Sequence, residues 1–154
     1  TRYISVTGVQ TCALPICVNT LRSKLEVSGD SYTSIAIAQE APKIPAGSKE
    51  LRQHRLAVGL YDLKGSELVR RRSVELDVSG SLTEVTALRG EKVADLVLIN
   101  DSDLTYAKVR LDPQSIETLK NHIGKLTDGL SRTVCWSASW DMMRDAEQIG
   151  RAHV

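Results

Sequence analysis

The chain is poor in the features that usually reveal an enzyme or a nucleic-acid-binding protein. Its formal net charge is only +1, which gives no reason to expect a nucleic acid or membrane partner. No apolar run approaches the ~20 residues that a membrane-spanning helix needs. The sequence has no Gly-rich phosphate loop, no Ser/His/Asp motif and no H-E-x-x-H zinc motif. We therefore expect no catalytic, cofactor-binding or metal-binding residue in this chain.

The two ends of the sequence are expected to be unrelated to the rest. Residues 10–16 read QTCALPI and residues 149–154 read IGRAHV. When back-translated, the two peptides look like opposite strands of one short sequencing adapter. We therefore interpret residues 1–17 and 149–154 as adapter-like artefacts and exclude them from the fold prediction. Cys12, Cys17 and His153 are excluded with them as possible ligands.

One cysteine, Cys135, then remains of the three in the sequence. A lone cysteine among apolar residues is most often a small buried hydrophobe. The remaining sequence has no disulfide framework, which is typical of a reducing compartment. We therefore expect a cytoplasmic protein.

Residues 18–111 alternate apolar and polar positions with the period of a β-strand. The clearest alternation lies in residues 54–62, where Leu56, Val58 and Leu60 share a face. A continuous apolar run at residues 96–99 is typical of a strand that is buried on both faces. Turn residues separate these segments from other expected strands at 24–27, 32–39, 68–78, 83–88 and 107–111. This pattern predicts a mainly β domain, an antiparallel β-sandwich of about seven strands.

The periodicity changes to that of a helix after Leu111. Asp112 suits an N-cap and Pro113 suits the first helical position. A break at residues 127–129 is followed by a second expected helix, from about residue 130 to residue 147. The apolar residues of this second helix lie on more than one face, so it should need partners on several sides. We therefore predict that residues 112–148 form the first two helices of a truncated helical domain.

Two polar motifs allow both a functional and a structural interpretation. Residues 100–103, Asn-Asp-Ser-Asp, resemble a calcium loop, but they offer too few ligands and no distal glutamate. A polar turn between two strands is favoured. The run Arg70-Arg71-Arg72 could bind an acidic partner, but strand alternation should point Arg71 away from its neighbours. A solvated sheet surface is therefore favoured for this run.

His54 and His122 are the remaining candidates for zinc ligands. They lie far apart on different elements, whereas a catalytic zinc takes three protein ligands with close spacing between two. A metal site is therefore not expected. Trp136 and Trp140 are one helical turn apart and could stack on a ligand, but this spacing is more typical of core residues. A solvated end or inter-helix ion pairs are expected for the charged residues that follow, Asp141, Arg144, Asp145 and Glu147.

Five segments of the sequence resemble one protein family. They resemble the region of bacterial aminopeptidase N enzymes where a small β-sandwich is followed by a large helical domain. The resemblance covers nearly all of residues 18–147, although Leu111 replaces an aromatic residue of many members, which indicates a bacterial subgroup. The segments are VNTL at 18–21, QEAP at 39–42, HRLAVGLY at 54–61, NDSDLTYAKVRLD at 100–112 and CWSASWDMMRDAE at 135–147.

The resemblance implies a zinc-dependent parent enzyme that removes N-terminal residues from peptides. In such enzymes zinc activates a water molecule and a glutamate acts as general base. No catalytic or zinc residue of the family falls in this region. We therefore expect a non-catalytic fragment whose sandwich braces the missing catalytic domain and whose helices begin the cover over its cavity. The alternative is a stand-alone β-sandwich interaction module with a helical tail.

Overall fold

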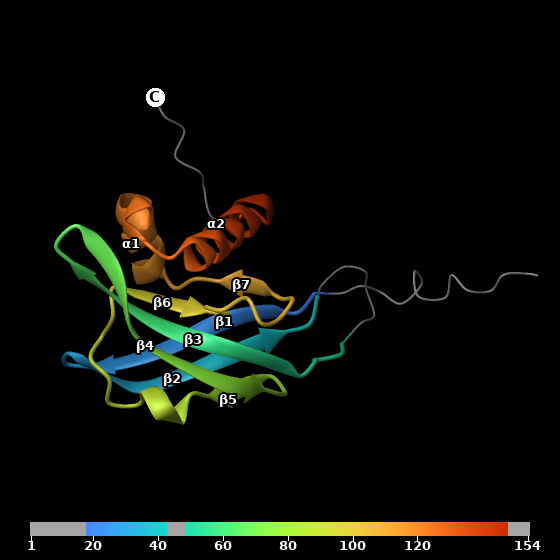
Figure 1. Cartoon of the computed structure of the whole chain (residues 1–154). Coiled ribbons are helices and arrows are strands. Elements are labelled where there is room, and N and C mark those ends of the chain that lie inside the picture. The colour runs from blue at the N-terminus through green and yellow to red at the C-terminus, as the bar shows by residue number, and fades with distance from the viewer. Residues whose placement is uncertain (1–17, 43–48, 148–154) are drawn as a thin grey trace, which may run out of the picture.

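A computed structural model describes residues 18–42 and 49–147 of the chain (Figure 1). Within these residues, seven strands form two sheets, and two α-helices follow at the C-terminal end. The prediction of a mainly β sandwich followed by two helices is confirmed. Residues 1–17 and 149–154, which were interpreted as adapter-like, lie outside the described ranges. Gln148, the last residue of the predicted helical segment, also lies outside them.

The first sheet has four strands in the order β5-β2-β1-β7. β1 and β2 form an antiparallel hairpin, and its turn contains Gly29 with a positive φ of 60°, which glycine adopts without strain. β7 pairs with β1 in parallel. The prediction of a wholly antiparallel sandwich was therefore wrong for this pair of strands. The parallel pairing arises because β7 follows a strand of the other sheet. The strands are β1 (Thr20–Ser28), β2 (Ser31–Glu40), β5 (Leu82–Glu84) and β7 (Lys108–Arg110).

The second sheet has three antiparallel strands in the order β4-β3-β6. β3 (His54–Lys64) and β4 (Glu67–Val78) form a long hairpin, and β6 (Leu96–Ile99) pairs with the other edge of β3. Leu56, Val58 and Leu60 are all 1% exposed or less, as predicted, but Ala57 and Tyr61 between and beyond them are also only 1% exposed, so β3 is buried on both faces rather than alternating. Leu56, Val58 and Leu60 form one hydrophobic core with residues of the first sheet.

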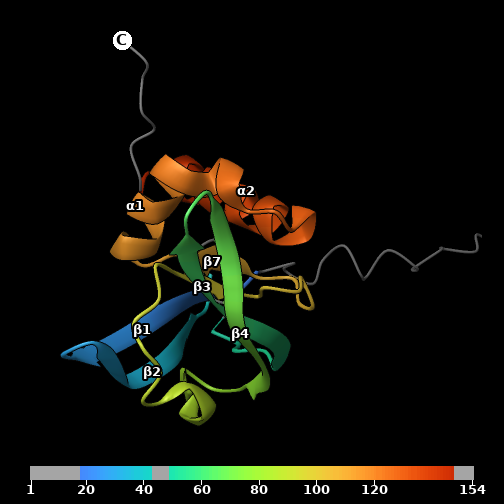
Figure 2. The same ribbon diagram turned by 60° about the vertical axis from the view of Figure 1, so that its left-hand side comes forward.

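β6 is buried on both faces, as its apolar sequence predicted. All four of its residues are buried. The first helix, α1 (Pro113–His122), packs against β6, and the backbone N–H of Val97 donates to Ser115 Oγ at 2.9 Å. The second helix lies beside β7 of the first sheet, so the two helices together cover the side of the sandwich where β6 and β7 lie (Figure 2).

Two strands depart from the prediction. The strand expected at residues 83–88 ends at Glu84 and is followed by a 3₁₀ turn, η2 (Thr86–Leu88), which places Leu88 in the core. Val27, which was expected to alternate regularly with its neighbours, is 50% exposed. The reason is a register shift between Glu26 and Val27 in the β1–β2 pair, because a bulge turns the side chains beyond it.

Both helices begin within one residue of their predicted starts, at Pro113 and at Gly129. Asp112 caps α1, and Asp128 caps the second helix, α2 (Gly129–Arg144). A 3₁₀ turn, η3 (Ile123–Lys125), lies between the two helices. α2 ends three residues before the predicted boundary. None of the described helices is long and apolar enough to span a membrane.

Candidate functional site: the junction between sandwich and helices

The two histidines considered as zinc ligands are not brought together. His54 opens β3, where its Nδ1 lies 2.7 Å from Thr105 Oγ1 while its buried Nε2 has no partner in the described chain. Burial, with a contribution from Arg52, lowers the pKa of His54. His122 closes α1. Across residues 18–42 and 49–147, no group of three or more His, Cys, Asp or Glu side chains is placed to hold a metal ion.

Residues 100–103 form a polar turn after β6, which agrees with the favoured interpretation. Asn100 and Asp103 have positive φ values of 62° and 51°, which these residue types tolerate better than most. The Asn100 amide donates to Thr105 O at 2.8 Å and accepts from Thr105 N at 3.2 Å. The side chain of Asn100 therefore stabilises the turn itself.

Sequence reasoning missed the charged group at the centre of this junction, Asp101. Its side chain is 0% exposed. Its Oδ1 accepts a hydrogen bond from Tyr61 Oη and lies 3.1 Å from Ser131 Oγ, whose single proton is shared between Asp101 and the N-cap carboxylate of Asp128. Its Oδ2 accepts a hydrogen bond from Arg70 Nη1 at 2.9 Å. One buried carboxylate thus contacts β3, β4 and α2. No local pattern signalled this role, because the partners lie 30 to 40 positions away in the sequence.

Asp101 affects two neighbouring residues of β3: it keeps the phenol of Tyr61 protonated, and it leaves no room for a side chain at Gly59. Burial and the hydrogen bond to Asp101 raise the pKa of Tyr61 far above its ordinary value, so the phenol remains a donor. A Cβ at Gly59 would lie 2.7 Å from Asp101 Oδ2 and 2.8 Å from the ring of Tyr61. Position 59 therefore requires glycine for reasons of space rather than of backbone conformation.

Both helices begin with the same motif, Asp-x-x-Ser. In each, the N-cap aspartate accepts from the backbone N–H of a serine three positions later, at 3.0 Å for Asp112–Ser115 and 2.9 Å for Asp128–Ser131. Both serines are buried and reach the sandwich. Ser115 accepts from a backbone N–H of β6, whereas Ser131 joins the carboxylate network of Asp101. The two helices thus begin with the same motif, but the serine of α1 contacts a neutral backbone group of the sandwich, whereas the serine of α2 contacts a charged carboxylate.

The three consecutive arginines are less solvated than predicted. The register of β4 against β3 shifts here, and Arg71 has no Cα partner on β3. Because of this bulge, Arg71 does not simply point away from both neighbours: Arg71 and Arg72 both reach Glu91, whereas Arg70 pairs with the buried Asp101. The Arg71 side chain is only 23% exposed. The prediction of a solvated sheet surface was therefore wrong for this arginine.

Two acidic residues after α2, Asp145 and Glu147, form ion pairs with basic residues of β1 and β7. Asp145 binds Lys108 Nζ at 2.7 Å and also contacts Arg110, whose side chain is 2% exposed. Glu147 binds Arg22 Nη2 at 2.7 Å and Arg110 Nε at 3.2 Å. Both residues are exposed, as expected of a solvated end, but their ion pairs reach β1 and β7 rather than another helix, because the chain after α2 returns to these strands.

These ion pairs change the acidity of both carboxylates. The hydrogen bond from Lys108 is the main reason that the pKa of Asp145 is lowered. Burial alone would raise the pKa of Glu147, but the hydrogen bonds and charges of Arg22 and Arg110 outweigh it, and this pKa is lowered as well. Both carboxylates are therefore ionised partners at neutral pH.

The outward face of α2 carries large apolar side chains. Trp136 and Trp140 are 58% and 60% exposed, and Met143 is 39% exposed. The opposite face is buried against the sandwich and includes Cys135, where burial and the charge of Asp101 raise the thiol pKa to about 12. The interpretation of the tryptophans as core residues is wrong within the described chain, whereas that of Cys135 as a buried hydrophobe agrees with the structure.

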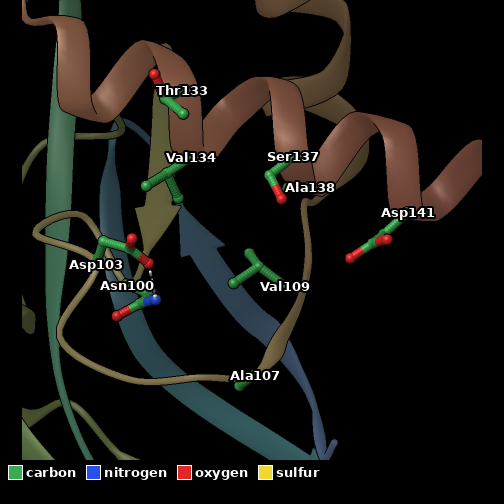
Figure 3. A pocket seen from close by; sticks show the side chains of 9 residues that line it. All are labelled: Asn100, Asp103, Ala107, Val109, Thr133, Val134, Ser137, Ala138 and Asp141. Carbon is green, nitrogen blue, oxygen red and sulfur yellow. Dashed lines mark hydrogen bonds between the residues drawn. The ribbon is translucent and has the colours of Figure 1, made fainter.

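A small cavity lies between α2 and the turn that follows β6 (Figure 3). Its volume is about 140 Å³, and its apolar lining includes Val109, Val134 and Ala138. Asp103 and Asp141 lie toward opposite ends of it (Figure 3). Pockets that enclose small-molecule ligands usually measure about 300–1,000 Å³. This cavity is therefore suited to solvent or to a single side chain, not to a peptide substrate.

Comparison with known proteins relates the junction to one family. Residues 96–149 match the ERAP1-like C-terminal domain family. Over 142 residues, the chain is 49% identical to aminopeptidase N from Streptomyces lividans, a match that covers 89% of this chain and 17% of that protein. The chain thus spans about a sixth of the length of this curated relative. The two matches show that the chain fits a fragment of an aminopeptidase N family protein.

Proposed function

We propose that this chain is a non-catalytic part of a zinc-dependent aminopeptidase that removes N-terminal residues from peptides. The observation that carries the proposal is the 49% identity to an aminopeptidase N over 89% of the chain. Zinc would be held elsewhere in the parent enzyme, by residues that this sequence does not contain. Peptides would be the substrates of the parent, and this region would contact them only through the domains that it supports.

The role proposed for this region is mechanical. The sandwich would brace the catalytic domain, and α1 and α2 would begin the helical cover over its cavity. The exposure of Trp136 and Trp140 supports this role, because exposed apolar patches often mark surfaces that pack against a partner. The partner in this proposal is the remainder of the helical domain of the same parent chain.

A bacterial and cytoplasmic parent is also proposed. The similar aminopeptidase N comes from a Streptomyces species. Cys135 is a free, buried thiol, which is compatible with a reducing compartment. Fractionation of cells that carry the natural gene, followed by detection with an antibody against α2, would test this location.

The experiment that tests the enzyme proposal compares this chain with the product of the extended reading frame. Both proteins are purified without metal-binding tags, assayed with an aminoacyl p-nitroanilide and analysed for zinc. We expect the extended protein to hydrolyse the anilide and to lose this activity with a chelator, and the 154-residue chain to have neither zinc nor activity.

Two results would contradict the proposal. Stoichiometric zinc and hydrolysis in the 154-residue chain would show that the fragment is itself catalytic. An extended reading frame without an H-E-x-x-H motif and without activity would instead favour a stand-alone interaction module.

A further inference from the structure

We propose that Asp101 is the positioning residue that fixes the N-terminal half of α2 on the sandwich. The inference rests on the geometry of the junction and does not depend on the peptidase assignment. Asp101 connects Tyr61 of β3 and Arg70 of β4 with Ser131 in the first turn of α2. The carboxylate therefore joins the second sheet and the helix, alongside a direct hydrogen bond from Tyr61 Oη to Ser131 Oγ at 2.8 Å.

The first turn of α2 has few other anchors. Leu130 is 47% exposed and Thr133 is also exposed, whereas Ser131 is fully buried. The apolar contacts of the helix come later, from Val134 onward. The far end of the helix is held separately, by the ion pairs that follow it. Loss of the Asp101 contacts should therefore release the beginning of α2 and not its end.

The comparison with α1 distinguishes positioning from ordinary capping. Ser115 and Ser131 each bond to the N-cap aspartate of their own helix. Ser115 reaches the sheet through one neutral hydrogen bond, from Val97 N at 2.9 Å. Ser131 instead reaches a carboxylate that is also bound by an arginine. Hydrogen bonds to charged groups are stronger than those between neutral groups, so α2 depends on its serine network more than α1 does.

The test uses Asp101→Asn, which preserves the shape of the side chain but replaces one acceptor oxygen by a donor. Hydrogen exchange is measured by mass spectrometry on the full 154-residue chain at neutral pH. We expect exchange in residues 129–138 to accelerate by roughly tenfold or more, because an unpaired buried polar group favours local opening. Exchange in β3 and in the last turn of α2 should change much less. Ser115→Ala is the matched control and should affect α1 only.

Thiol labelling gives a second measurement of the same opening. In a Cys12→Ser, Cys17→Ser background, Cys135 is the only thiol, and it lies in the N-terminal half of α2. Its labelling should accelerate with Asp101→Asn and should be unchanged with Ser115→Ala. Unchanged exchange and labelling with Asp101→Asn would overturn the proposal.

If the Asp101→Asn chain unfolds globally, two milder variants test the proposal instead. Tyr61→Phe and Ser131→Ala each remove one hydroxyl from the network and leave the carboxylate in place. Their effects on exchange in residues 129–138 should be clearly non-additive in the double variant, because the two hydroxyls bond to each other at 2.8 Å and both reach one oxygen of Asp101. Additive effects would show that the network does not act as a unit, and would refute the proposal.

Discussion

The exposed tryptophans of α2 allow a direct comparison of two apolar residues on one helix. Trp140 is 60% exposed, whereas Met142, two positions later, is 4% exposed. A fully buried tryptophan removes about 150–250 Å² from water, so the covered part of Trp140 amounts to roughly 60–100 Å². At about 25 cal/mol per Å², this area stabilises the fold by roughly 1.5–2.5 kcal/mol as an upper bound. Trp140→Gln should cost about 1 kcal/mol or less, because glutamine retains part of the contact.

Met142→Ala should cost more, although methionine is the smaller side chain. Removing a buried methionine side chain typically costs about 2–5 kcal/mol, because a cavity remains. Urea denaturation followed by far-ultraviolet circular dichroism measures both free energies of unfolding by linear extrapolation. Circular dichroism is preferred to fluorescence here, since Trp140→Gln removes one of the two fluorophores.

Intrinsic fluorescence checks the same surface in the unmodified chain. Trp136 and Trp140 are its only tryptophans. Their emission in the native chain should already be close to that of solvent-exposed indole, and acrylamide should quench it readily. The reasoning would be refuted if Trp140→Gln cost as much as Met142→Ala, or if native emission were strongly blue-shifted. Either result would show that this face is covered within the chain.

Three further predictions concern the junction. Gly59→Ala should destabilise the chain by about 1–3 kcal/mol in urea denaturation, because the added Cβ would lie 2.7 Å from Asp101 Oδ2; an unchanged midpoint would argue against this contact. The lowered pKa of Asp145, caused first by Lys108, means that this pair contributes stability above the ordinary pKa of 3.8 and loses it as the pH falls through the lowered folded value. Asp145→Asn should reduce that part of the acid dependence of stability, and an identical pH profile would contradict the assignment. The raised pKa of Cys135, about 12, predicts that peptide mapping after alkylation at pH 8 finds this thiol unmodified in the native chain and modified in urea; rapid native modification would show that α2 opens freely.

The sequence predicted most of the architecture because the decisive patterns are local. The inward positions Leu56, Val58 and Leu60, the N-cap residue Asp112 and the break at residues 127–129 each depend on neighbours a few positions away. The parallel pairing of β7 with β1 and the bulge at Arg71 were missed. These features depend on how distant segments meet, and a one-residue bulge has no signature in a run of identical arginines.

The network around Asp101 was missed for the same reason. An acidic residue after an apolar strand is most simply interpreted as part of a solvated turn, and its neighbour Asn100 does occupy such a turn. Only the approach of β4 and α2 turns Asp101 into a buried group that contacts an arginine and three hydroxyls, those of Tyr61, Ser73 and Ser131. By contrast, the need of α2 for additional partners followed from its own composition, and the exposure of Trp136 agrees with that inference.

The double burial of β6 has a consequence for how this region can evolve or be divided. A boundary at residues 111/112 separates strands from helices in sequence, but one face of β6 and the carboxylate of Asp101 belong to both sides of it. Removing the helices would expose one face of a completely apolar strand and leave Asp101 without Ser131. The match to the ERAP1-like C-terminal domain family also begins at residue 96, at the start of β6. Sandwich and helices should therefore be inherited, exchanged and lost together, as one unit of recombination.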